Sequence, residues 1–89
     1  MKVKMFLLIF GRSNCPYCTS AKKIAEKLKN TLHDFHYRYI DIEIEKITKN
    51  DLSKKVGKIV NTVPQIFLDG EYIGGFTDFE KYTKENLLI

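Results

Sequence analysis

The sequence predicts one α/β domain over residues 1–89: a four-stranded mixed sheet flanked by helices, in the order βαβα followed by ββα. Three observations carry this prediction. An apolar run at residues 3–10 precedes a helical pattern, and a second run, rich in aromatic and branched residues, spans 35–42. The dipeptide Asp69-Gly70, which is typical of hairpins, then separates two further short apolar runs.

The first half of the chain predicts a strand, a helix and a second strand. Residues 3–10 are continuously apolar, which is typical of a strand buried on both faces. After a turn at 11–14, Pro16 suits the first helical turn, where its missing N–H is not needed. Four apolar residues then recur at helical spacing and give this helix one apolar face: Ile24, Ala25, Leu28 and Leu32. Residues 35–42 predict the second strand, which closes a right-handed βαβ unit.

The middle of the chain predicts a short helix and a hairpin. Thr48 is a suitable N-cap for a helix over 48–56, and Gly57 is a suitable residue to end it. Residues 65–68 predict the strand before the hairpin dipeptide, and Gly74-Gly75 ends the strand that returns from it.

The end of the chain predicts a last helix. Thr77 and Glu80 have the spacing of a capping box, with Thr77 as the N-cap. The helix is expected to run to about Leu87 and to bury Phe79, Tyr82 and Leu87.

Composition and charge exclude several classes of function. No apolar run reaches the roughly 20 residues of a membrane span, and the run at 3–10 is too short for a signal peptide. We therefore expect a cytoplasmic protein without membrane contact. The net charge is +4, and lysines are spread over the predicted helices. These lysines are interpreted either as solvated helix faces or as a source of long-range attraction for anionic partners. No run of basic residues is interleaved with aromatic ones and no recognised nucleic-acid motif occurs, so no nucleic-acid partner is expected.

The two cysteines, Cys15 and Cys18, indicate redox or metal chemistry. A bridge between them closes almost no loop, so a structural disulfide is poorly motivated. Zinc normally takes four ligands, and His33 and His36 lie far along the chain and read as surface residues. No metal site is expected within one chain, whereas a metal bridging two chains stays open.

The position of Cys15 favours catalysis by its thiolate, which is the nucleophile in thiol–disulfide exchange. Cys15 lies where the first strand turns into the first helix, so the helix N-terminus is expected to stabilise its negative charge. Arg12 adds positive charge nearby. Cys18 is expected to lie deeper and to attack only when Cys15 is held in a mixed disulfide.

Three motifs together resemble the glutaredoxins, most closely the short dithiol bacterial members. They are Gly-Arg-Ser-Asn-Cys-Pro-Tyr-Cys at 11–18, Thr-Val-Pro-Gln-Ile-Phe at 62–67 and Ile-Gly-Gly-Phe-Thr-Asp at 73–78. The resemblance spans essentially the whole chain and implies a thioredoxin-like fold. General thioredoxins carry Trp-Cys-Gly-Pro-Cys, whereas this chain has no tryptophan.

The resemblance also implies roles for individual residues. Cys15 matches the nucleophile and Cys18 the resolving cysteine, with glutathione as co-substrate and no tightly bound cofactor. Tyr17 flanks the bound glutathione in this scheme. The other residues implied in glutathione binding are Arg12, Thr62, Val63, Pro64 (as a cis-proline that faces the cysteines), Gly75, Phe76, Thr77 and Asp78. Phe76 departs from the pattern, because tyrosine is expected there and its hydroxyl is lost.

The function implied is a monomeric, glutathione-dependent oxidoreductase that reduces protein disulfides and protein–glutathione mixed disulfides, for example in ribonucleotide reductase. One alternative is a carrier of an iron–sulfur cluster shared by two chains and ligated by glutathione; Pro16 in the motif resembles the enzymatic branch instead. Another is a thioredoxin-type enzyme reduced directly by a flavoenzyme, against which Thr62-Val63 and Thr77-Asp78 argue.

Overall fold

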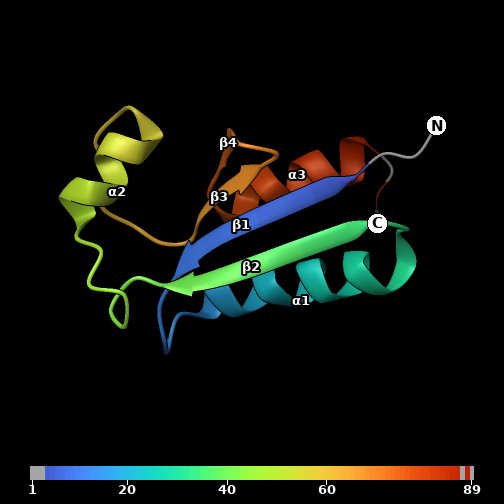
Figure 1. Ribbon diagram of the computed structural model, residues 1–89, viewed down its shortest axis with the longest axis horizontal. Coiled ribbons are helices and arrows are strands. Elements are labelled where there is room, and N and C mark those ends of the chain that lie inside the picture. The colour runs from blue at the N-terminus through green and yellow to red at the C-terminus, as the bar shows by residue number, and fades with distance from the viewer. Residues whose placement is uncertain (1–3, 87, 89) are drawn as a thin grey trace.

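A computed structural model describes residues 4–86 and 88 and confirms the predicted order of elements. The four strands form one sheet in the order β2-β1-β3-β4, in which β1 pairs parallel to β2 and all other pairs are antiparallel (Figure 1). The elements are β1 (Met5–Gly11), α1 (Pro16–Thr31), β2 (Phe35–Asp41), α2 (Lys49–Val56), β3 (Gln65–Leu68), β4 (Glu71–Gly74) and α3 (Phe76–Glu85). Of the helices in this part of the chain, none has the length and apolar character that a membrane span requires.

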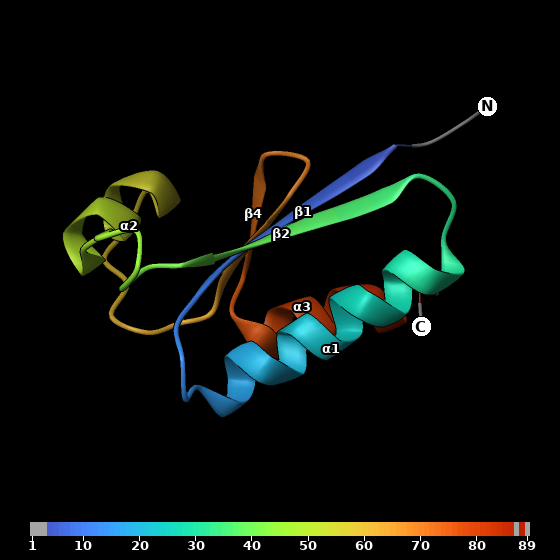
Figure 2. The same ribbon diagram turned by 60° about the horizontal axis from the view of Figure 1, so that its bottom comes forward.

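Helices cover both faces of the sheet, as predicted, but unequally. α1 and α3 lie side by side on one face, where they bury the larger core (Figure 2). That core contains Leu7, Ile9, Ala21, Ala25, Leu28, Phe35, Ile66, Leu68 and Phe79. α2 lies at one end of the sheet and buries a smaller cluster of Phe10, Ile42, Leu52, Val60 and Phe67 against the opposite face.

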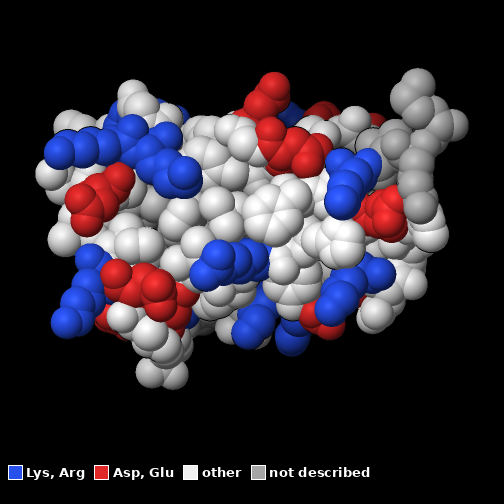
Figure 3. Space-filling model, viewed as in Figure 1, with Lys and Arg blue, Asp and Glu red and all other residues white. Residues whose placement is uncertain are grey.

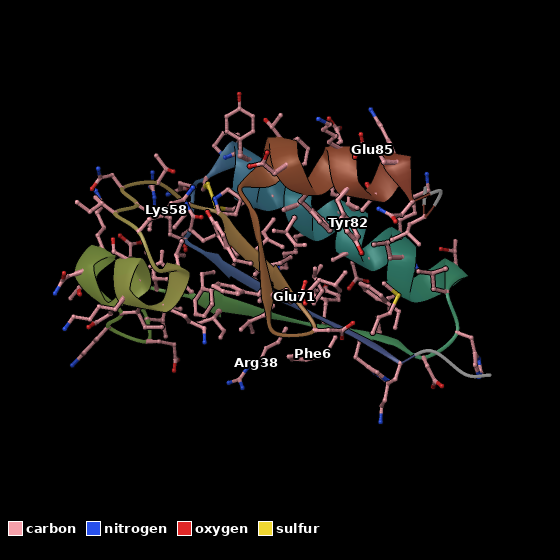
Figure 4. The ribbon with its side chains drawn as sticks, turned by 90° about the horizontal axis from the view of Figure 1, so that it is seen from above. Phe6, Arg38, Lys58, Glu71, Tyr82 and Glu85 are labelled. Carbon is pink, nitrogen blue, oxygen red and sulfur yellow. A yellow bond between two sulfur atoms is a disulfide. The ribbon has the colours of Figure 1, made fainter. Side chains whose placement is uncertain are left out.

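The prediction that the first strand is buried on both faces is wrong for its first half. Phe6 is 45% exposed and lies on the side of the sheet away from α1 and α3 (Figure 4). The physical reason is the small size of α2, which packs only near the far end of β1, around Phe10. Residue 3, where the predicted strand begins, lies outside the described residues.

The short helix and the hairpin begin and end as predicted. The Thr48 hydroxyl accepts from the Asp51 backbone N–H at 3.0 Å, and the Asp51 carboxylate accepts from the Thr48 N–H at 3.0 Å. Gly57 ends α2 with a left-handed φ of 91°. Asp69 and Gly70 both have positive φ, 50° and 84°, as a tight turn between antiparallel strands requires.

The predicted capping box at the last helix is wrong. α3 begins at Phe76, with Gly75 as N-cap and no side-chain cap hydrogen bond. The Phe79 N–H donates to the Gly75 carbonyl oxygen at 3.0 Å, so the first turn closes before Thr77 reaches the capping position. Phe79 is buried and Tyr82 packs partly buried against the core, as predicted, while Leu87 lies outside the described residues.

Candidate active site

Cys15 is the N-cap of α1, directly after the loop that leaves β1. Its backbone is extended (φ −118°, ψ 106°), and its sulfur accepts a hydrogen bond from the Cys18 N–H at 3.2 Å. Pro16 opens the helix, as predicted, and the first turn contains no acidic residue. The unpaired N–H groups and the positive end of the helix dipole therefore stabilise negative charge on the Cys15 sulfur.

Cys15 and Cys18 form a disulfide, with their Cα atoms 5.2 Å apart. It appears as the yellow bond at the N-terminal end of α1 (Figure 4). Cys15 keeps 6% of its surface exposed, whereas Cys18 is completely buried. An incoming thiolate or disulfide therefore meets Cys15 first, and Cys18 is reached through Cys15.

The loop before β3 faces the disulfide. The Cys15 sulfur lies 3.7 Å from the Val63 carbonyl oxygen, and the Val63–Pro64 peptide bond is cis. Residues 48 positions apart in the sequence, Cys15 and Val63, thus form the two sides of one site.

Buried Gln65 holds this loop in place. Its amide nitrogen donates to the Thr62 carbonyl oxygen at 2.9 Å, and its amide oxygen accepts from the Tyr72 hydroxyl on β4. The sheet therefore fixes the backbone beside Cys15 through a side chain that sequence reasoning did not assign to the site.

A small cleft of about 280 Å³ gathers most of the residues that the resemblance implied in glutathione binding. The aromatic ring of Tyr17, which is 63% exposed, packs on the ring of Phe76 with the centroids 5.9 Å apart. The cleft is lined by Tyr17, Thr62, Val63, Pro64, Gly75, Phe76 and Thr77. Their roles in binding stay predictions, but the structure brings all seven together.

Arg12 and Asp78 do not line this small cleft. Asp78 lies in the first turn of α3, and a Cβ atom on Gly74 would overlap its side chain. Gly74 also has a φ of 130°, so this close approach requires glycine. Arg12 lines a second, larger cleft that shares Thr62 and Val63 with the small one.

Two residues of β2, which sequence reasoning missed, anchor the loop that carries Arg12. The Tyr39 hydroxyl donates to the Arg12 carbonyl oxygen at 3.1 Å, and the Ser13 hydroxyl donates to the Asp41 carboxylate at 3.3 Å. A Cβ atom on Gly11 would overlap the Tyr39 side chain, so the end of β1, from which this loop leaves, packs directly against Tyr39. Burial raises the pKa of Tyr39 above its ordinary value.

Comparison with known proteins identifies the family. Residues 7–73 match the family model for glutaredoxin. The chain belongs to the glutaredoxin family. It is 64% identical to glutaredoxin 1 of Salmonella typhimurium over 83 residues, which cover 93% of this chain and 95% of that protein. Among solved structures it resembles reduced Escherichia coli glutaredoxin, with a TM-score of 0.84, 60% identity and coverage of 92% and 96% of the two chains.

A plant member of the family is also similar in structure. The buckwheat glutaredoxin–glutathione complex matches with a TM-score of 0.72 and 26% identity, covering 92% of this chain and 71% of that one. The thioredoxin-like fold predicted from the sequence is confirmed. This glutaredoxin is accordingly an enzyme, a thiol–disulfide oxidoreductase whose redox-active pair is Cys15 and Cys18.

Tyr39→Phe is expected to raise KM for a disulfide substrate about two- to fivefold and leave kcat nearly unchanged. Loss of one hydrogen bond to the Arg12 carbonyl oxygen frees the loop beside Cys15 and costs about 1 kcal/mol of unfolding free energy. Steady-state kinetics and urea unfolding measure the two effects.

Tyr37→Phe is the matched control, because Tyr37 lies on the same strand and donates to Glu26 of α1, away from the site. It should lower stability by a similar amount and leave KM unchanged. Equal KM values for both variants and the unmodified protein would show that Tyr39 has no positioning role.

Proposed function

We propose that this glutaredoxin reduces protein disulfides and protein–glutathione mixed disulfides with electrons from glutathione. The observation that supports this most is the small cleft beside Cys15, whose walls come from the active-site helix, the Thr62–Pro64 loop and the start of α3. A cleft of this size open to solvent suits a tripeptide, and the similar buckwheat glutaredoxin is a glutathione complex.

The two ends of the cleft offer different chemistry to glutathione. On one side, Thr62 is exposed and Val63 is half-buried, and the backbone of this loop suits pairing with an extended peptide. On the other, the first turn of α3 has no side-chain cap, so its N–H groups are left for a ligand carboxylate. Asp78 follows Thr77 in that turn, just outside the residues that line the cleft, and supplies the negative charge that an α-amino group needs. The γ-glutamyl end of glutathione carries both groups, and we propose that it binds there.

The proposed reaction with a mixed disulfide needs only Cys15. The Cys15 thiolate attacks the glutathione sulfur, and the substrate protein leaves as its thiol. A second glutathione thiolate then attacks the glutathione sulfur bound to Cys15, which releases glutathione disulfide and regenerates the Cys15 thiolate. One free glutathione is consumed in each cycle, because the mixed disulfide itself supplies the other half of the glutathione disulfide: the substrate sulfur is reduced as the sulfur of the incoming glutathione is oxidised.

Reduction of a protein disulfide uses both cysteines. Cys15 attacks one sulfur of the substrate, and Cys18 then attacks Cys15, which releases the reduced protein and leaves the Cys15–Cys18 disulfide. Two glutathione molecules reduce that disulfide in turn. We propose disulfide-containing enzymes such as ribonucleotide reductase as substrates, acted on by a monomer in the cytoplasm.

The test is turnover of a glutathionylated small disulfide, coupled through glutathione reductase to oxidation of NADPH. The proposal expects rapid turnover that requires glutathione and saturates with the glutathionylated substrate. Folded, metal-free protein that gives no turnover would overturn it. Turnover sustained equally well by a flavoenzyme reductase without glutathione would instead identify a thioredoxin-type enzyme.

A further inference from the structure

A second cleft, of about 770 Å³, continues from the small one past Val63. Thr62 and Val63 line both clefts, so the two are separated only by the loop that faces Cys15. Its other walls come from the loop between β2 and α2, the start of α2 and Asn61. α2 and the N-terminal end of α1 lie at the same end of the sheet (Figure 1).

The wall formed by residues 42–47 is held by its own hydrogen bonds. One carboxylate oxygen of Asp41 accepts from the Glu43 N–H at 2.9 Å and from the Ile44 N–H at 3.1 Å. The Ile47 N–H donates to the Ile42 carbonyl oxygen at 2.8 Å, and the capping box of Thr48 follows directly. The cleft is therefore formed in the free protein, and its floor includes the buried side chains of Ile42 and Leu52.

The charged residues that line this cleft are mostly basic. They are Arg12, Lys46 and Lys49, against the single acid Glu43. Basic side chains also gather over α2 on the face seen in Figure 3, with acidic ones between them. Neither Lys46 nor Lys49 forms an ion pair with any other residue in the described part of the chain.

The positions of the two lysines work against helix stability. Lys49 is the first residue of α2, where the helix dipole favours acidic side chains, and Lys46 lies three residues earlier, in the loop that leads to this helix end. Asp51 is the acidic residue in the first turn of α2, where it completes the capping box with Thr48. Cations at this helix end are therefore not explained by the stability of α2, and they face a cleft beside the nucleophile.

We propose that the larger cleft binds the polypeptide chain of a protein substrate, as an extended acidic segment next to the cysteine that Cys15 attacks. A chain whose sulfur is bonded to Cys15 passes Val63 and enters the cleft, where apolar side chains meet Ile42 and Leu52 and carboxylates meet Lys46 and Lys49. The inference rests on the proposed function, and it names the substrates that the enzyme prefers.

Two synthetic peptides test it. Each carries one intrapeptide disulfide, and they differ only in flanking residues, which are Asp and Glu in one and Asn and Gln in the other. We expect a higher kcat/KM for the acidic peptide, a preference that fades as salt rises. The double variant Lys46→Gln, Lys49→Gln should lower kcat/KM for the acidic peptide about three- to tenfold. It should not change kcat/KM for the neutral peptide or for the glutathionylated small disulfide. Glu43→Gln should raise kcat/KM for the acidic peptide.

The matched control is Lys23→Gln, Lys27→Gln on the exposed face of α1, which removes the same charge and lines neither cleft. If this control lost as much kcat/KM for the acidic peptide as the Lys46→Gln, Lys49→Gln variant does, the preference would come from the net charge of the protein, and the inference would be overturned. Equal kcat/KM of the unmodified protein for the two peptides would overturn it too. So would a Lys46→Gln, Lys49→Gln variant that loses kcat/KM equally for the acidic peptide and for the glutathionylated small disulfide.

A binding measurement separates failure of this inference from failure of the proposed function. The acidic peptide with serines in place of its cysteines is titrated into the oxidised protein, and amide chemical shifts are followed. Shifts confined to Ile47, Leu52 and Asn61 and their neighbours support docking in the cleft even if turnover is absent. Shifts elsewhere, or none, contradict it.

Discussion

Cys15→Ser is expected to abolish turnover of both glutathionylated substrates and protein disulfides, by at least about a thousandfold in kcat/KM. The serine hydroxyl stays protonated at neutral pH, so the helix N-terminus that stabilises a thiolate at this position has no anion to stabilise. Cys18 does not substitute for it, because its side chain is completely buried behind Cys15. The NADPH-coupled assay with both substrate types measures the loss.

The fold of this variant should be intact. A serine oxygen at position 15 can accept the same hydrogen bond from the Cys18 N–H. Urea unfolding under reducing conditions, with neither protein disulfide-bonded, is the control. Residual turnover within tenfold of the unmodified protein would show that Cys15 is not the nucleophile.

Cys18→Ser is expected to separate the two activities. Reduction of a glutathionylated substrate should continue at a rate within about threefold of the unmodified protein, because glutathione resolves the intermediate on Cys15. Reduction of protein disulfides should fall at least tenfold. In the mixed disulfide with Cys15, the second thiol of the substrate can attack back and re-form the substrate disulfide, and only the neighbouring Cys18 sulfur is close enough to attack Cys15 first. The same coupled assay, run with the two substrate types side by side, gives the ratio.

Cys18→Ala is the companion variant. Position 18 is fully buried, so a serine hydroxyl there costs about 1–3 kcal/mol if it finds no partner, whereas alanine adds no polar group. Both variants should show the same separation of activities. Protein disulfides reduced at the original rate by either one would refute the two-cysteine mechanism.

Local patterns determined most of the fold. Thr48, Gly57 and Asp69-Gly70 each act through hydrogen bonds or backbone angles within a few residues, so their effects were visible in the sequence. The start of α3 was not, because Gly75 already caps that helix, in an extended conformation, as the chain leaves β4. Phe6 was misjudged because its exposure depends on how far α2 reaches across the sheet.

The site residues that belong to the three sequence motifs were predicted, whereas contacts that form only when distant segments come together in the fold were missed. The residues of three separate motifs, from Tyr17 to Thr77, line one cleft. The hydrogen bond from Tyr39 to Arg12 spans 27 positions and leaves no pattern in the sequence. The larger cleft was also missed, because nothing in the sequence distinguishes Lys46 and Lys49 from the many other surface lysines; only the fold places them in the same cleft as Val63.

Mass spectrometry of Cys18→Ser after exposure to glutathione disulfide tests the central claim most directly. Cys15 is then the one cysteine left in the chain. The account predicts rapid formation of a single glutathione adduct at Cys15, which added glutathione removes as glutathione disulfide. Folded protein whose Cys15 thiol reacts with a small alkylating agent but forms no glutathione adduct would contradict it.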